Sequence, residues 1–493
     1  MATVYKIHPA IGVARVGNHE TAFFIGPESP GSPGVEIDAN GVETPLASYK
    51  EGGLVKRQAA RFRVFAYEQD AVGNQQLVGE IGPDAHVEWT VDLVNRKAAF
   101  DGNVGPAGPR NAGIADRDSL IIRGAQPATI AGCGQPPEVL SGTFLGKEVY
   151  LGEIQTDGAG RLLFLGGRGA SGSVPPGEPM FSFANNDRWH DDVSDGPVSA
   201  TVTLPGQAPV AVHEPAWVAV APPDFAPTID AIVSLYDIAF QAGIDKGAIQ
   251  PDASPSFTQH IKPMIERTTD MRWVDKWTEW AGLVPVDWDA LADPGPASKA
   301  ARERMAGRIR NPGLSAFGLP AFLNTYLTKW AAGNFISDLG TPVPSEPIPQ
   351  QLDRVALEHC TGNNFFPGIE AGQNLKDKDI YARPFRLDPS NVGKVYPGCL
   401  TEIMALPWQA DFYACDGGDW WPTQRPDLVM TDANDVPGSE AEWENPINGF
   451  QPMVDQVLRL GFIVSQQVGE DTVFGEVDRD PQFPRQPRQL RQP

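Results

Sequence analysis

The chain is poor in the residues that build metal and disulfide sites. Its 493 residues include only 4 cysteines and 7 histidines. The cysteines, Cys133, Cys360, Cys399 and Cys415, form no C-x-x-C pair and have no regular spacing, so neither a disulfide framework nor a structural zinc site is encoded. The histidines stand apart in the sequence. We therefore expect no metal cofactor and interpret the cysteines as reduced thiols.

Basic residues and long apolar runs are scarce as well. Lysine and arginine number 39 against 62 aspartate and glutamate residues, which gives a net charge of −23. A field of this sign repels phosphate and anionic lipid, which argues against nucleic acid and membrane surfaces as partners. No run approaches the roughly 18 apolar residues of a membrane-spanning helix, and the first residues lack the apolar core of a secretory signal. The sequence therefore predicts a cytoplasmic protein.

Proline and glycine are abundant instead, with 47 and 51 residues. They make up about a fifth of the chain, against an average of about 12%. Long uninterrupted helices therefore cannot dominate the fold. A hydrophobic content of 41% is ample for a core and argues against wholesale disorder. We predict a loop-rich protein of the α+β class.

Strand and helix signals separate along the chain. Short β-branched and aromatic runs bounded by turn residues, such as ARFRVFAYEQD and HVEWTVDLVN, fill the first part. Apolar residues at helical spacing begin near Thr228, and the pattern continues over 273–283, 297–309 and 321–332. We expect a β-rich, sandwich-like domain over 1–225, a helical and loop-rich domain carrying the site over 226–475, and an extended tail over 476–493.

One glycine-rich segment matches the sequence pattern of a nucleotide-binding motif but lacks the helix that such a motif needs. Residues 167–172 read G-x-G-x-x-G after an apolar strand signal. A dinucleotide site needs a helix next, because the helix N-terminus faces the pyrophosphate. The sequence that follows, SVPPGEP, cannot form that helix. We interpret the motif as a flexible loop.

The most informative segment lies in the last third of the chain. Residues 408–421 hold three tryptophans, three aspartates and one cysteine, and we expect this stretch to be too broken for regular structure. An irregular loop of this composition indicates a functional site, and a Trp-Trp-Pro plug that packs a loop onto a sheet is the alternative. Asp411 precedes Cys415 by four residues, so one helical turn or a tight loop would bring carboxylate and sulfur together.

This segment resembles the lysine ε-oxidase and glycine oxidase family, the amino-acid oxidases that carry cysteine tryptophylquinone. The likeness extends over nearly the whole chain, because further blocks resemble the family in the same order. These blocks are 6–18, 24–28, 56–63, 185–187, 194–198, 358–360, 365–370 and 407–412.

The resemblance implies an oxidative deamination. A tryptophan quinone joined to cysteine by a thioether would supply an electrophilic carbonyl for a primary amine. Dioxygen would accept the electrons, and an oxo product, ammonia and hydrogen peroxide would be released. On this mapping Cys415 supplies the sulfur, Asp411 is the base, and Tyr236, His359 and Cys360 line the pocket. Core packing of Tyr236 and an inert Cys360 are the alternatives.

The same resemblance indicates the partners. The substrate would be a small-molecule amine or amino acid, and the acidic balance of the chain is compatible with a cation. A quinone would require a flavoprotein maturation partner, and the resemblance leaves a homo-oligomer open.

The resemblance to the family does not extend to the tryptophan that forms the quinone. The family places its tryptophan in a helix of the form Met-Val-x-x-Trp-x-x-Leu-Gly-Phe, and this chain has Val457 at that position. Trp420, Trp421 and Trp443 are the rings that could substitute, and Trp421 lies six residues after Cys415. Three hypotheses therefore stand: an oxidase with a tryptophylquinone on another ring, a quinone-free enzyme that uses Asp411 and Cys415 directly, and a non-catalytic scaffold.

Overall fold

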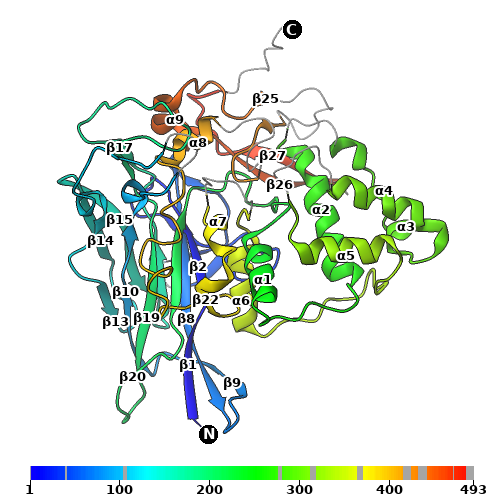
Figure 1. Ribbon diagram of the computed structural model, residues 1–493, viewed down its shortest axis with the longest axis horizontal. Coiled ribbons are helices and arrows are strands. Elements are labelled where there is room, and N and C mark those ends of the chain that lie inside the picture. The colour runs from blue at the N-terminus through cyan, green and yellow to red at the C-terminus, as the bar shows by residue number, and fades with distance from the viewer. Residues whose placement is uncertain are drawn as a thin grey trace.

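The computed structural model describes residues 2–38, 41–103, 108–275, 280–310, 318–362, 370–414, 423–430, 441–469 and 471–484. A large mixed sheet from the first part of the chain occupies one side, and helices from the middle part occupy the other (Figure 1). The predicted α+β class with a β-rich N-terminal region is confirmed. No helix within these ranges is long and apolar enough to cross a membrane.

The strand β8 (Arg57–Gln69) organises the sheet. Its second half pairs antiparallel with β1 (Ala2–His8), and its first half pairs antiparallel with β16 (Leu162–Leu165). β2 (Ile11–Arg15) runs parallel to β21 (Ala216–Ala221) and meets β8 where Arg15 pairs with Gln58. This arrangement brings the end of β2 to the centre of the molecule.

The alternation of buried and partly exposed side chains along a strand shows which face of the sheet packs against the core. Along β19 (Asp195–Thr203) the buried Val198, Ala200 and Val202 alternate with partly exposed residues, as expected for a strand with one buried face. The remaining strands of the sheet are β3 (Phe23–Ile25), β4 (Val35–Ile37), β5 (Glu43–Pro45), β9 (Gln75–Glu80), β10 (His86–Val91), β11 (Val94–Asn95), β12 (Ile122–Arg123), β13 (Ala128–Ala131), β14 (Glu138–Phe144), β15 (Lys147–Thr156) and β20 (Val210–Ala211).

The first helix, α1 (Leu235–Asp245), begins later than the apolar spacing near Thr228 indicates. Ser234 and Asp237 form a capping box in which each side chain accepts the other's backbone N–H group, and this fixes the helix start. The expected start was therefore wrong.

The helices α2 to α7 divide into two groups. α2 (Lys262–Asp270), α3 (Trp288–Ala292), α4 (Lys299–Arg310) and α5 (Ala321–Ala331) form a lobe with its own apolar core around Leu327 and Trp330, seen on the right of Figure 1. α6 (Ile348–Glu358) and α7 (Gly372–Leu375) contact α1, and α6 also packs against β2.

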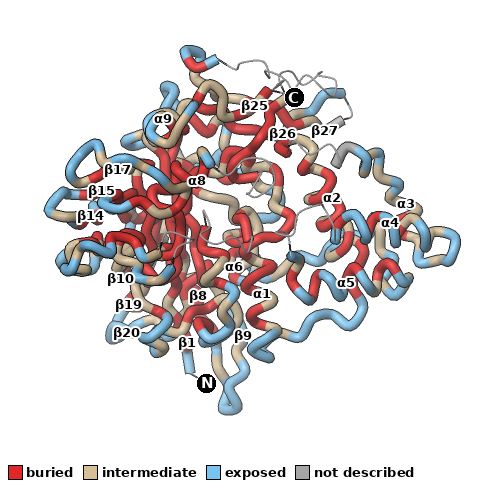
Figure 2. Tube along the Cα trace, turned by 45° about the horizontal axis from the view of Figure 1, so that its top comes forward, coloured by how far each residue is buried: buried red, intermediate tan, exposed pale blue. Residues whose placement is uncertain are grey.

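The C-terminal region joins the sheet through one continuous apolar core. It contains α8 (Trp408–Ala414), α9 (Phe450–Gln456) and the hairpin of β26 (Phe462–Val468) and β27 (Asp471–Val477). The core extends from Tyr5 to Phe483, and Figure 2 shows buried segments running from the sheet into the region around α8 and β26. The 476–484 part of the predicted tail includes the end of β27 and the buried Phe483.

Candidate active site

Asp411 lies on a helix, although the sequence around it suggests broken structure. α8 spans Trp408–Ala414, and the Asp411 side chain is fully buried. The backbone N–H of Trp408 at the start of the helix donates to Oδ2 of Asp191 at 3.2 Å. Asp191 forms an ion pair with Lys97, and both of these side chains are 0% exposed. A buried charge therefore fixes the N-terminus of the helix.

An arginine fixes the other end of α8. Nε of Arg425 donates to the carbonyl oxygen of Phe412 at 2.6 Å, and the guanidinium lies 5.8 Å from the centre of the Trp443 ring. The ring of Phe225 packs against both Phe412 and Trp443, at centroid distances of 6.1 and 4.8 Å. α8 is thus anchored at both ends by groups distant in sequence.

The glycine motif at 167–172 packs beside α8. Its last two residues, 171 and 172, belong to β17 (Ser171–Ser173), which pairs with β18 (Trp189–Asp191), so a strand stands where a nucleotide-binding site would need a helix. A Cβ atom at Gly167 would lie 2.3 Å from Cγ of Asp192, and one at Gly169 would lie 3.0 Å from Cδ1 of Leu458. The motif is therefore a packed loop, and the expectation that it is flexible was wrong.

The described residues do not fit a quinone at the usual position. Val457, fully buried in the turn after α9, has no ring to oxidise. Trp443 is also fully buried, and its Nε1 donates to the carbonyl oxygen of Gly461 at 2.9 Å. Its ring is therefore packed in the core. The predicted cofactor residues Cys415, Trp420 and Trp421 lie outside the described residues.

A second polar cluster surrounds Arg15 at the end of β2. Nη1 of Arg15 donates to Oε1 of Glu370 at 2.6 Å, and Nη2 donates to the carbonyl oxygen of His359 at 2.9 Å. Nη2 also lies 3.5 Å from Sγ of Cys360 and 3.9 Å from Oδ2 of Asp224. The cluster therefore includes the side chain of the predicted Cys360 and the backbone of the predicted His359.

Burial controls the protonation of this cluster. It raises the pKa of Asp224 to about 7, although the Arg15 guanidinium acts in the opposite direction. Burial and the Glu370 carboxylate raise the pKa of the Cys360 thiol well above its usual value, so the sulfur stays protonated. A single guanidinium faces two buried carboxylates, and Asp224 can therefore take up a proton near neutral pH.

His359 carries charge more readily than an ordinary histidine. Burial lowers its pKa, but the carboxylates of Asp230, Glu358 and Asp224 outweigh burial and raise it above the usual value. Nδ1 of His359 lies 3.0 Å from Oδ1 of Asp230.

Two cavities flank the Arg15 cluster. One, with a cavity volume of about 30 Å³, lies between the sheet and α6 and is lined by His359, Cys360 and Gln58. The other, of about 20 Å³, is lined by Arg15, Asp224 and also Gln58. The backbone N–H of Phe225, beside Asp224, donates to the carbonyl oxygen of Gln424 at 3.1 Å. Because Arg425 follows Gln424, this segment connects the Arg15 cluster to α8.

Tyr236 lies away from both cavities. Its ring stacks on Phe385 at a centroid distance of 5.1 Å and an interplanar angle of 9°, and it also contacts Phe240. Burial raises the pKa of Tyr236 above its usual value. Its role in a pocket stays a prediction, and its contacts are those of a packed side chain.

Sequence reasoning missed the groups that hold the predicted residues in place. Arg15 closes an apolar strand and Glu370 ends a family block, which is a weak signal for the first cluster. Lys97, Asp191 and Gln409 carry no signal of their own in the sequence. Within the described ranges, no group of three or more histidine, cysteine, aspartate or glutamate residues could hold a metal ion.

Comparisons with known proteins extend over most of the chain. The family model for the N-terminal part of L-lysine ε-oxidase matches residues 8–220, and the model for the C-terminal domain matches residues 311–443. An L-lysine 6-oxidase of Marinomonas mediterranea is 27% identical over 83% of this chain and 71% of the relative.

Solved structures share the fold. The crystal structure of the L-Lys ε-oxidase from Marinomonas mediterranea matches with a TM-score of 0.78 and 23% identity, over 97% of this chain and 95% of that one. The structure of its Schiff base intermediate with L-Lys matches over the same shares with a TM-score of 0.79.

Proposed function

Because the chain belongs to the L-lysine ε-oxidase family and is an oxidase of the amine and amino-acid class, we propose that it deaminates a small primary amine or amino acid with dioxygen. In the overall reaction the amine, dioxygen and water give an oxo product, ammonia and hydrogen peroxide. The observation that supports this most directly is Asp411, a fully buried carboxylate on a helix anchored at both ends.

Asp411 would serve as the general base. It would take the proton from the carbon that bears the amine, and the two electrons of that C–H bond would pass on to dioxygen. A carboxylate can do this only if it is held in hydrogen-bonding reach of the reacting carbon. The anchored helix would supply that fixed position, and exclusion of water by the surrounding core would keep the base unsolvated.

The carrier of the two electrons separates two versions of the site. In the first, Cys415 would be cross-linked to Trp420, Trp421 or Trp443, and the resulting tryptophylquinone would supply the electrophilic carbonyl and store the electrons. In the second, the alternative to the oxidase, the chain is a quinone-free member of the same family with a different enzymatic role that uses Asp411 and Cys415 directly. The buried Val457 at the usual tryptophan position favours this second version. A non-catalytic scaffold is the remaining alternative.

Intact mass distinguishes these versions. We expect protein co-expressed with its genomic neighbours, including a flavoprotein maturation partner, to be about 28 Da heavier than the unmodified chain if the quinone forms. That mass corresponds to two added oxygens and four lost hydrogens, and visible absorption should accompany it. An unmodified mass would rule out the quinone. An enzymatic activity of that unmodified protein that is lost in Cys415→Ala or Asp411→Ala would support the quinone-free version.

Asp411→Asn tests the base in either version. We expect kcat for peroxide production to fall at least about 100-fold, the contribution of a positioned general base. The matched control is Asp455→Asn, on the exposed side of α9, which should stay within about twofold of the wild type. If Asp411→Asn keeps the wild-type kcat, Asp411 is not the base.

A cytoplasmic location and a homo-oligomer belong to the same proposal.

A further inference from the structure

The loop formed by residues 167–172, here called the glycine loop, holds two buried side chains. On one side the backbone N–H of Ala170 donates to Oδ2 of Asp192 at 2.9 Å. On the other side Gln409, a residue of α8, makes two hydrogen bonds: its Nε2 donates to the carbonyl oxygen of Gly169 at 3.0 Å, and its Oε1 accepts from Oγ of Ser171 at 2.7 Å. The loop thus forms hydrogen bonds with both the Nε2 and the Oε1 atom of the Gln409 side chain.

The glycine loop also contacts the turn where the family pattern places its tryptophan. Gly169 has a φ of +73°, and a Cβ atom there would lie 3.0 Å from Leu458, the residue after Val457. The loop therefore lies between α8 and this turn. Gly169 allows the backbone to adopt a positive φ and to approach Leu458 closely, which a larger residue would prevent.

Because Gln409 and Asp411 lie on the same helix, the contacts of Gln409 influence the direction in which the Asp411 side chain points. Successive residues of an α-helix are about 100° apart, so the side chains of Gln409 and Asp411 leave the axis about 200° apart. Contacts that hold Gln409 on one face therefore set the rotation of the helix and aim Asp411 on the opposite face. α8 spans seven residues, and a helix this short has no stable orientation without tertiary contacts.

Gln409 is well suited to this task because it is 0% exposed. Loss of its side chain would leave a buried carbonyl and a buried hydroxyl of the loop without these bonds. The anchors at Asp191 and Arg425 bind backbone groups at the two ends of α8. The two hydrogen bonds of Gln409 lie between these ends and add a restraint on a side chain, which acts on the rotation of the helix.

We propose that the glycine loop and Gln409 form a clamp that positions Asp411 for proton abstraction. Gln409 is a positioning residue in this scheme, since it acts through the helix and not on the substrate. The inference rests on the proposed role of Asp411 as the base.

The test compares Gln409→Met, which keeps the length of the side chain and removes both hydrogen bonds, with Gln351→Met as a matched control. Gln351, on α6, also donates from Nε2 to a backbone carbonyl, that of Glu28, at 2.9 Å. We expect Gln409→Met to lower kcat by at least about tenfold with KM within about threefold, because small displacements of a catalytic group have large effects. Ser171→Ala, which removes one of the two bonds, should lower kcat less, and Gln351→Met should leave it unchanged.

Hydrogen exchange gives a second measurement that needs no activity. In Gln409→Met the amides of α8 should exchange at least about tenfold faster than in the wild type, while those of α5 stay unchanged. If the wild type oxidises no amine, the proposed function fails and the clamp is tested by exchange alone. The clamp is overturned if exchange of α8 is unaffected. It is also overturned if exchange rises in an active enzyme whose kcat per folded molecule is unchanged.

Discussion

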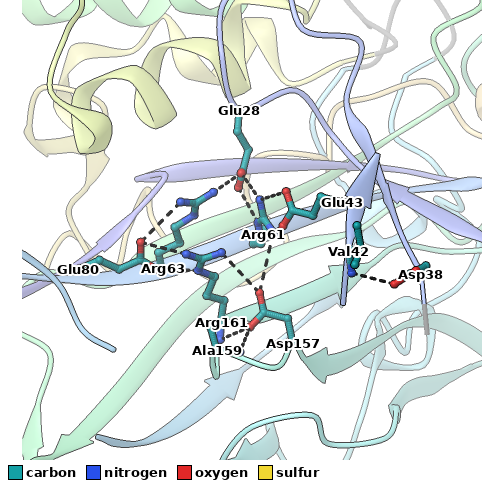
Figure 3. Close-up of polar contacts among 10 residues, drawn as sticks. All are labelled: Glu28, Asp38, Val42, Glu43, Arg61, Arg63, Glu80, Asp157, Ala159 and Arg161. Carbon is teal, nitrogen blue, oxygen red and sulfur yellow. Dashed lines mark hydrogen bonds and ion pairs between the residues drawn. The ribbon is translucent and has the colours of Figure 1, made fainter. Parts of the chain in front are cut away.

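The ionic network over the sheet and the ion pair beneath α8 use the same kinds of side chain, but they differ in how many partners each charge has and in how far water reaches them. Arg61 in the network is buried, whereas its outer members are partly exposed. Figure 3 shows the network, in which Arg61 contacts both Glu28 and Glu43, and Glu80 contacts both Arg63 and Arg161. The Arg161 and Glu80 side chains are 26% and 24% exposed. Lys97 and Asp191, in contrast, pair with each other at 0% exposure.

This difference shows where the molecule tolerates change. A charge in the network that loses one partner keeps a second partner or meets water, so the loss is small. A charge in the buried pair that loses its partner has no water to replace it, so the loss is large. The sheet is therefore held redundantly, whereas the helix that carries Asp411 depends on a few contacts that cannot be replaced.

The largest expected effect comes from breaking the buried pair. Lys97→Met leaves the Asp191 carboxylate buried without its cation, although Asn95 and the backbone of Trp408 still donate to it. We expect the free energy of unfolding to fall by about 3–5 kcal/mol, the usual effect of removing one partner of such a pair. Urea denaturation followed by tryptophan fluorescence measures it.

Two further variants control this result. Lys147→Met, at an exposed position on β15, should change the free energy of unfolding by no more than about 0.5 kcal/mol. The double variant Lys97→Met/Asp191→Asn removes both charges and should recover part of the loss. Equal stability of Lys97→Met and Lys147→Met would contradict the contrast between the two clusters.

A smaller effect, visible only as a pH dependence, comes from Asp192 behind the glycine loop. Burial raises its pKa to about 7. The folded protein thus binds this proton more tightly than the unfolded chain does, so stability from this group is greatest below about pH 4 and is lost as pH rises towards 7. Asp192→Asn cannot ionise, and its stability relative to the wild type should therefore rise by a few kcal/mol between pH 4 and pH 8.

The measurement is urea unfolding of both proteins across this pH range. Asp84→Asn, at an exposed position, is the control and should show a constant difference from the wild type. A constant difference for Asp192→Asn as well would mean that burial does not raise the pKa of Asp192.

Elements with a strong local pattern were predictable from the sequence. Apolar spacing over 321–332 predicts a helix, and α5 spans Ala321–Ala331. The strand signal in the run ARFRVFAYEQD corresponds to most of β8 (Arg57–Gln69). These elements are specified by residues within a few positions of one another, which a pattern of hydrophobic residues records.

The candidate site was only partly predictable, for a physical reason. Asp411, His359 and Cys360 could be singled out through the family resemblance, but the helical state of 408–414 could not. α8 is stabilised by Asp191, the glycine loop and Arg425, and Gln409 lies 238 residues from Ser171 in the chain. Contacts of that separation leave no local signature. The pairing of Arg15 with Glu370, 355 residues apart, was missed for the same reason.

The smallest expected effect comes from the network of Figure 3 and completes the comparison with the buried pair of Lys97 and Asp191. Arg161→Met removes the contacts of Arg161 with Glu80 and Asp157, but Glu80 keeps Arg63 at 3.6 Å and Asp157 keeps Arg61 at 3.9 Å. We expect the free energy of unfolding to fall by no more than about 1 kcal/mol at low salt. The difference should shrink further in 1 M NaCl, where charges are screened beyond about 3 Å. A salt-independent loss as large as that of Lys97→Met would mean that the network acts as one coupled unit, and that partial exposure does not protect it.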